Sequence, residues 1–205
     1  MADLRQKQKQ KREEAIINAA KELIAEKGYR NTSIEEIAER AEVGPATVYN
    51  YFTSKSNLFV TVFRQEVEIL LEIGAEIVAN PPADPEEAVS SLMGAYFGGF
   101  MDRYNKQLMR EIFIAALVEQ LSVRQELIGL DYALMAQLTG LLNVIKDRGD
   151  INISITVEDL AFIIYSVTMT DLMMYFADED MTSSDCLSLM KHHISLALQG
   201  FSPKQ

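Results

Sequence analysis

The sequence predicts an all-α fold of about nine helices, arranged as a small N-terminal headpiece followed by a larger C-terminal helical domain. Apolar residues recur with helical rather than strand spacing through almost all of residues 65–205. Proline, glycine and capping residues interrupt this pattern at intervals, as helix ends require. A chain of 205 residues is long enough to form both parts.

The helix boundaries follow from these interruptions. Asn80-Pro81-Pro82 should end a long helix over residues 54–79, because proline lacks an amide donor and disfavours the α conformation in the residue before it. Asp84 and Pro85 should begin the next helix, as its cap and its first residue. Further boundaries are expected near residue 105 and within 121–124, 149–155 and 177–182, with Thr156/Asp159 and Thr182/Asp185 as capping boxes and Gly28, Gly149 and Gly200 as C-terminal stops.

Residues 33–55 read as two short helices joined by a tight turn. Ser33 and Glu36 have the spacing of a capping box at the start of the first helix. Gly44 follows the turn, and Pro45 stands where a first helical residue needs no amide donor. Two helices with such a turn form the helix-turn-helix motif that reads DNA, although a short helical hairpin can also serve packing alone.

The second of these helices has one apolar and one short polar face. At about 100° per residue, Val48 and Phe52 fall on the apolar side, whereas Ala46, Thr47 and Asn50 fall on the opposite side. We therefore assign Val48 and Phe52 to the core. The small polar face is one that a DNA major groove accepts.

Charge is distributed unevenly along the chain. The protein carries a net charge of −11, but residues 1–64 are net positive by two charges and the rest is strongly acidic. This pattern, with a pI of about 4.7, favours a small surface aimed at nucleic acid over general coating of it. A basic arm is expected ahead of the first helix, either on DNA phosphates or as a solvated terminus: Arg5, Lys7, Lys9, Lys11 and Arg12.

The segment from Ile16 to Phe63 resembles the TetR family of one-component transcriptional repressors. The resemblance rests on the string Thr47-Val48-Tyr49-Asn50-Tyr51-Phe52, followed by Lys55, Leu58 and Phe59. The chain departs from the family pattern at Gly44, where a capping Ser is frequent, and at Pro45 and Ala46, where Lys and Gly are frequent. These departures bear on base preference and not on the fold.

The resemblance implies a three-helix helix-turn-helix headpiece over residues 1–53, with a basic N-terminal arm, and a ligand-binding and dimerisation domain over residues 54–205. It implies phosphate contacts from Ser33, Thr47, Tyr51 and Lys55. The base-facing set would be Pro45, Ala46, Tyr49 and Asn50, with Asn50 able to bond an adenine edge. Simple packing is the alternative for Tyr49 and Tyr51.

The last two helices carry more apolar surface than one core needs. Residues 160–176 are apolar nearly all round, and residues 187–201 are apolar over most of their circumference. A homodimer through these helices would bury the second side, at the place where the resembled family dimerises. A deep core within one chain is the alternative.

The middle helices are the expected place for a small-molecule effector. Residues 93–104 place three glycines among four aromatic residues in a helix, so that either another helix approaches closely or a cavity stays open. The family implies a pocket here, whereas an aromatic and Met stripe is ordinarily core. The candidate lining, for an apolar or aromatic effector, is Tyr96, Phe97, Phe100, Tyr104, Phe113, Tyr132, Tyr165, Met169, Asp171 and Met173, in which a cationic ligand could partner the Asp171 carboxylate.

Catalysis, metal binding and membrane insertion are not expected. His192 and His193 are adjacent and neither has an acidic residue or cysteine three or four positions before it, so we expect no catalytic site, metal or cofactor. The N-terminus is too charged for a signal peptide, and the longest unbroken apolar run, residues 112–118, is short. The single cysteine, Cys186, fits a reducing cytoplasm and is interpreted as a small packed side chain.

The function these features predict is a cytoplasmic transcriptional regulator, most simply a repressor. It would bind a palindromic double-stranded DNA operator as a dimer and be released by a small effector. The alternative is a helical protein-interaction module whose headpiece does not bind DNA. Salt-dependent binding to a palindromic fragment separates the two.

Overall fold

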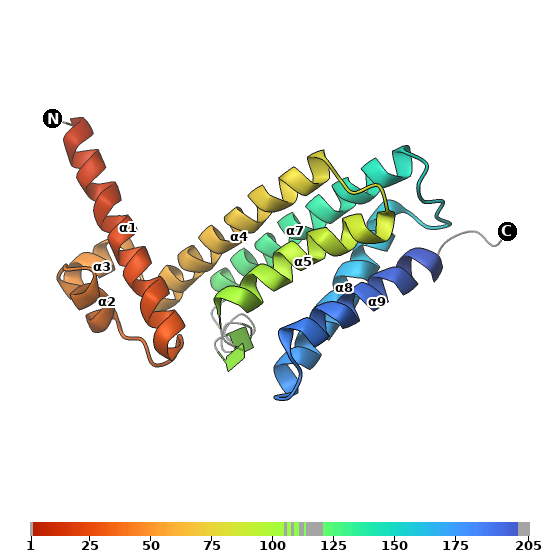
Figure 1. Cartoon of the computed structure of the whole chain (residues 1–205). Coiled ribbons are helices and arrows are strands. Elements are labelled where there is room, and N and C mark those ends of the chain that lie inside the picture. The colour runs from red at the N-terminus through yellow and green to blue at the C-terminus, as the bar shows by residue number, and fades with distance from the viewer. Residues whose placement is uncertain (1, 105, 108, 111–112, 114–120, 201–205) are drawn as a thin grey trace. The chain divides into compact units, whose positions relative to one another are not determined.

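The protein, seen in a computed structural model, is all helical over the residues that the structure describes, which are 2–104, 106, 107, 109, 110, 113 and 121–200 (Figure 1). The absence of strands in these residues confirms the predicted fold class. Eight helices are described, close to the predicted nine: α1 (Ala2–Lys27), α2 (Ile34–Arg40), α3 (Pro45–Tyr51), α4 (Lys55–Ala79), α5 (Pro85–Arg103), α7 (Leu121–Asp147), α8 (Val157–Ala177) and α9 (Ser183–Gly200).

The chain divides into two compact units. The first consists of Met1–Glu66 with Tyr104–Ile128, and the second of Val67–Arg103 with Gly129–Gln205. Helix α4 contributes residues to both units. From here on, the headpiece means residues 2–66, with α1, α2, α3 and the start of α4, in place of the predicted range of 1–53.

The helix ends lie where the capping signals placed them. The Thr156 hydroxyl accepts from the Asp159 amide at 3.1 Å, and the Thr182 hydroxyl accepts from the Asp185 amide at the same distance. The Asp84 carboxylate accepts from the Glu87 amide at 2.8 Å ahead of α5. Gly28 and Gly149 have φ of 85° and 80°, the left-handed conformation that ends a helix without steric cost for glycine.

The headpiece has its own apolar core. The three helices and the start of α4 bury aliphatic and aromatic side chains against one another, and this buried set fixes α3 on α1 and α2. Its members with less than 4% exposure include Ile16, Ile17, Ala20, Ile37, Ala38, Val48, Phe52, Leu58, Phe59 and Val60.

In the second unit, α8 packs along α9, and α5 packs on α9. The glycines of α5 show why this is possible. A Cβ on Gly98 would lie 3.6 Å from Leu187 of α9, and one on Gly99 would lie 3.1 Å from Leu70 of α4. Close helix approach therefore accounts for Gly98 and Gly99, whereas a Cβ on Gly94 would meet nothing within 4 Å.

The N-terminal basic residues correct the sequence prediction. They were expected in an arm ahead of the first helix, but α1 begins at Ala2 and includes all of them. The physical reason is that Gln, Lys and Arg favour helix and that no proline or glycine interrupts residues 2–27. Helical spacing places Lys7 and Lys11 on one side of α1 and Arg5, Lys9 and Arg12 on the other, where their side chains are exposed.

Two described helices are long and apolar enough to cross a membrane by length and composition, Arg124–Asp147 and Val157–Ala177. Unbroken apolar runs had not identified them. Core helices of globular proteins meet the same criterion, so this observation is weak evidence for a membrane.

Candidate functional site

The turn between α2 and α3 has the geometry of a Schellman motif. The Val43 amide donates to the Ala38 carbonyl at 2.9 Å, and the Glu42 amide donates to the Glu39 carbonyl at 3.1 Å. Glu42 has a φ of 55°, in the left-handed region where glycine is usual. Gly44 follows this turn, as predicted, and caps α3 with an extended backbone at φ −75°.

Helix α3 presents two distinct faces, as predicted. Val48 is fully buried and Phe52 is 3% exposed, so these two residues anchor the helix in the headpiece core. The outward side is formed by exposed Pro45, Ala46, Tyr49 and Asn50, flanked by half-buried Thr47 and Tyr51.

Tyr49 is the exposed aromatic residue on this face. Its side chain is 53% exposed, although a ring of this size usually packs. Packing against the headpiece therefore does not explain Tyr49. Tyr51 is half-buried and its ring lies 6.4 Å from that of Phe52, so packing accounts for part of its surface.

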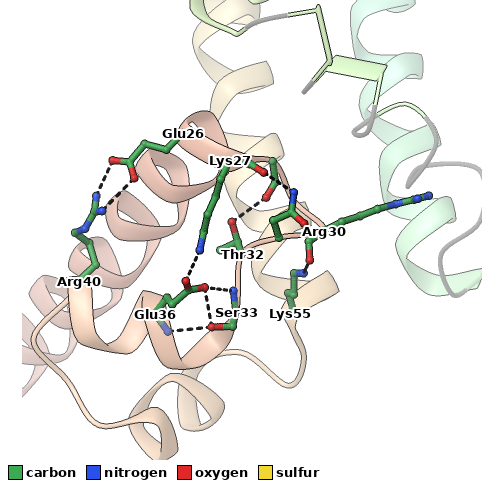
Figure 2. A network of polar contacts seen from close by, with 10 residues as sticks. Glu26, Lys27, Arg30, Thr32, Ser33, Glu36, Arg40 and Lys55 are labelled. Carbon is green, nitrogen blue, oxygen red and sulfur yellow. Dashed lines mark hydrogen bonds and ion pairs between the residues drawn. The ribbon is translucent and has the colours of Figure 1, made fainter.

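Ser33 caps α2 in the predicted capping box (Figure 2). Its amide and hydroxyl both donate to Glu36 Oε2 at 2.8 Å, and its hydroxyl accepts from the Glu36 amide at 3.2 Å. Lys27 forms an ion pair with the same carboxylate. The bond from Lys27, together with those from Ser33, lowers the pKa of Glu36 to about 2.

This arrangement bears on the predicted phosphate contact of Ser33. The hydroxyl already donates to Glu36, so a phosphate at this point would meet a carboxylate that Lys27 neutralises. The phosphate role of Ser33 stays a prediction.

A second ion-pair group joins α2 to α1 (Figure 2). The Arg40 guanidinium donates to Glu26 at 3.0 and 3.1 Å and to Glu22 at 3.1 Å. The hydrogen bond from Arg40 lowers the pKa of Glu26, and these carboxylates raise the pKa of Arg40. The Arg40 charge is therefore committed to holding the helices together.

Lys55, at the start of α4, contacts the segment that joins α1 to α2. Its ammonium donates to the Arg30 carbonyl at 3.3 Å (Figure 2). The same ammonium lies 4.3 Å from the centre of the Tyr29 ring. The predicted phosphate-binding lysine is thus held at a defined place on the headpiece.

The candidate effector residues are spread over both units. In the second unit, Tyr96, Phe97 and Asp171 are buried, Phe100, Tyr165 and Met169 are half-buried, and Tyr132 and Met173 are 63% and 51% exposed. Tyr104 and Phe113, both half-buried, fall in the first unit.

Some of these candidates make hydrogen bonds to α7 or a ring contact with one another. The Tyr96 hydroxyl donates to Gln137 Oε1 at 2.5 Å, and the Tyr165 hydroxyl donates to Asp131 Oδ1 at 2.8 Å. Phe97 and Tyr165 have ring centres 6.3 Å apart. Burial raises the pKa of both Tyr96 and Tyr165, so both hydroxyls remain protonated donors at neutral pH.

Asp171 has a partner that sequence reasoning missed. Its carboxylate, 1% exposed, lies 2.8 and 3.0 Å from Nδ1 of His193 on α9. Spacing within one helix shows only partners three or four residues away, whereas Asp171 and His193 lie 22 residues apart, on two different helices. A cationic ligand is therefore not required to partner Asp171. Among the described residues, no group of three or more metal-binding side chains occurs.

Comparisons with known proteins bear on both units. The family model for bacterial regulatory proteins of the tetR family matches residues 16–62, which include the whole helix-turn-helix. The fatty acid metabolism regulator protein of Bacillus subtilis is 29% identical over 139 residues, a match that covers 68% of this chain and 66% of that protein. Residues 16–62 therefore match the TetR family, and the whole chain is similar to regulators of that family.

Solved TetR-family structures share the fold over nearly the whole chain. A putative TetR-family regulator from Mesorhizobium loti has a TM-score of 0.76 at 18% identity, covering 95% of this chain and 98% of that one. Thermus thermophilus FadR, a TetR-family repressor in complex with lauroyl-CoA, has a TM-score of 0.71 at 20% identity, covering 94% and 96%. The matched family model and both of these solved structures are described as bacterial or transcriptional regulators.

Proposed function

We propose that the protein is a ligand-responsive transcriptional regulator that binds duplex DNA through the outward face of α3. The observation that carries the proposal is this face itself. The outward side of α3 carries small and polar residues and an exposed tyrosine, and its other side is buried in the headpiece core. The helix lies within the residues that match the TetR family model. A helix of this kind fits the width of a major groove.

The proposed roles divide between bases and phosphates. Pro45, Ala46, Tyr49 and Asn50 face the base edges, with Asn50 bonding adenine and the small apolar groups meeting thymine methyls. Thr47, Tyr51, Lys55 and Ser33 contact the sugar-phosphate backbone and set the register of the headpiece. Asn50→Ala should relax preference at one base step, whereas Lys55→Ala should weaken binding to all sequences and flatten its salt dependence.

We further propose that the protein acts as a homodimer through α8 and α9. The support is apolar surface on these helices: Phe162 and Met174 of α8 are 61% and 55% exposed, and Leu196 of α9 is 52% exposed. Apolar exposure of this extent on paired helices is buried when a second copy packs on it. Two headpieces would then read two half-sites of a palindrome about 34 Å apart.

The effector would bind within the second unit and act through α4. We propose an apolar ligand beside the aromatic residues of α5, with an acyl chain of a thioester such as lauroyl-CoA as the first to test, because the similar Thermus thermophilus repressor is described with that ligand. Ligand binding that shifts α4 would change the spacing of the headpieces and release the DNA. The change in operator affinity equals the ligand's preference for the released state.

Selection of fragments from a random DNA pool tests the DNA-binding proposal. The expected product is a palindromic sequence whose affinity falls steeply with salt concentration. Enrichment of no sequence, with no salt-dependent binding, would favour the alternative of a helical protein-interaction module in the cytoplasm. Lauroyl-CoA added to the selected complex should lower its affinity; an unchanged affinity at saturating lauroyl-CoA would contradict the acyl proposal alone.

A further inference from the structure

Tyr29 occupies an unusual position in the headpiece. It follows Gly28, whose φ of 85° turns the chain out of α1, and its side chain is 8% exposed. The ring packs on Phe59 of α4 with 4.6 Å between ring centres, and its hydroxyl lies 3.1 Å from Ser56 Oγ. The Tyr29 side chain is therefore held at its ring by Phe59 and at its hydroxyl by Ser56.

The same ring supports the charge of Lys55. The ammonium of Lys55 stands 4.3 Å from the ring centre, within the range of a cation–π contact. It also donates to the carbonyl of Arg30, the residue next to Tyr29, at 3.3 Å. Two groups of one turn thus hold the end of a side chain that is otherwise among the most mobile in proteins.

The turn that carries these groups is itself tied to α1 (Figure 2). The Thr32 hydroxyl donates to the Gly28 carbonyl at 2.9 Å, and the Asn31 side-chain amide donates to the Lys27 carbonyl at 2.9 Å. The support beneath Lys55 is therefore a hydrogen-bonded platform, which we define as residues 28–32.

We propose that Tyr29 is a positioning residue for DNA binding, which orders the Lys55 ammonium before the phosphate arrives. A lysine that is ordered in the free protein loses less side-chain freedom on binding, so its phosphate contact is made at lower entropic cost. Because the ammonium has three donors, it can meet a phosphate and keep its carbonyl and aromatic contacts. The proposal rests on the proposed function, because the buried Tyr29 affects DNA binding only if Lys55 contacts a DNA phosphate.

A double-mutant cycle on duplex DNA of random sequence tests this proposal, because phosphate contacts do not depend on sequence. Tyr29→Leu should weaken binding about two- to fivefold in the wild-type background, as loss of an exposed cation–π contact predicts. In the Lys55→Ala background, where the salt slope is already smaller by about 0.9, Tyr29→Leu should have no further effect. Tyr29→Phe should bind like wild type, because it keeps the ring and loses only the hydroxyl.

An equal loss from Tyr29→Leu in both backgrounds would overturn the proposal, since a residue that only supports the fold acts with or without Lys55. A wild-type chain that binds no duplex would instead overturn the proposed function, and this inference with it.

A measurement on the free protein covers the case in which Tyr29→Leu does not fold. The NMR signals of the Lys55 ε-methylene protons should be shifted upfield by the ring, in wild type and in Tyr29→Phe. Unshifted signals, like those of an exposed lysine such as Lys191, would overturn the proposal.

Discussion

The side-chain amide of Gln137 on α7 donates to the main-chain carbonyl of Leu71 on α4, at 2.9 Å. The other end of the same side chain accepts from the buried Tyr96 hydroxyl of α5 at 2.5 Å. One residue therefore joins three helices of the second unit. Gly74 makes room for it, because a Cβ at that position would lie 2.1 Å from Gln137 Oε1 and 3.0 Å from Leu92.

Gly74→Ala should destabilise the protein by about 1–3 kcal/mol, the usual cost of overpacking. The added methyl group would push Gln137 from its place and strain the contact with Leu92. Gly140→Ala is the matched control, because its Cβ would meet nothing within 4 Å and alanine favours helix by about 1 kcal/mol. The urea concentration at the midpoint of unfolding should fall for Gly74→Ala and rise for Gly140→Ala. A rise for both variants would show that Gly74 is not tightly packed.

Gln137→Leu should cost about 1–3 kcal/mol, because the buried Tyr96 hydroxyl loses the acceptor that it has in the wild type. Adding Tyr96→Phe to this variant should restore part of the loss, since both members of the polar pair are then apolar. The free energies of unfolding of the two single variants and the double variant measure this coupling. Strictly additive losses would mean that the hydrogen bond contributes nothing.

Glu42→Gly should stabilise the headpiece by about 0.5–1 kcal/mol, because glycine adopts the left-handed φ of 55° without the steric cost that a glutamate has. Glu39→Gly is the control, as it places glycine inside α2 and should destabilise by about 1 kcal/mol. Thermal unfolding of both variants checks the sign. A loss of stability in Glu42→Gly would imply that the Glu42 side chain stabilises the turn.

Glu36→Gln should lower the thermal stability of the headpiece at neutral pH and have a diminishing effect in acid. The folded-state pKa of Glu36 is about 2, below its ordinary value of 4.5, because Lys27 and Ser33 bond the ionised carboxylate. Its stabilisation is therefore complete above about pH 4.5 and is lost as the pH falls toward 2.

This prediction is tested by measuring the melting temperatures of wild type and Glu36→Gln between pH 7 and pH 2. Glu35→Gln, on the exposed side of α2, is the control. The gap between wild type and Glu36→Gln should close between pH 4.5 and pH 2. A gap that stays constant over this range would contradict the assignment.

Most of the fold follows from local signals in the sequence. The capping residues Ser33, Thr156 and Thr182 and the prolines after residue 80 act within a few residues, so their effect on helix ends is readable without the structure. The burial of Val48 beneath exposed Asn50 likewise follows from helical periodicity alone.

The contacts between distant residues could not be predicted in this way. His193 pairs with Asp171 across two helices, and Gln137 bridges to Leu71 over 66 residues, so neither is visible as a spacing. The left-handed Glu42 was also missed, because a glutamate gives no indication of that conformation. The start of α1 at Ala2 was also missed. The charges of the basic segment suggested a solvated arm, but its Lys, Arg and Gln residues also favour helix.

The central claim is that the outward face of α3 reads DNA. The most direct measurement is the affinity of wild type and Asn50→Ala for a fragment selected from a random pool and for fragments changed at single positions, with Asn80→Ala, after the end of α4, as the control. We predict that Asn50→Ala loses about 1–3 kcal/mol of discrimination at one base pair in each half-site, while Asn80→Ala binds like wild type. Undiminished discrimination at every position in Asn50→Ala and in the matching Tyr49→Ala variant would contradict the account.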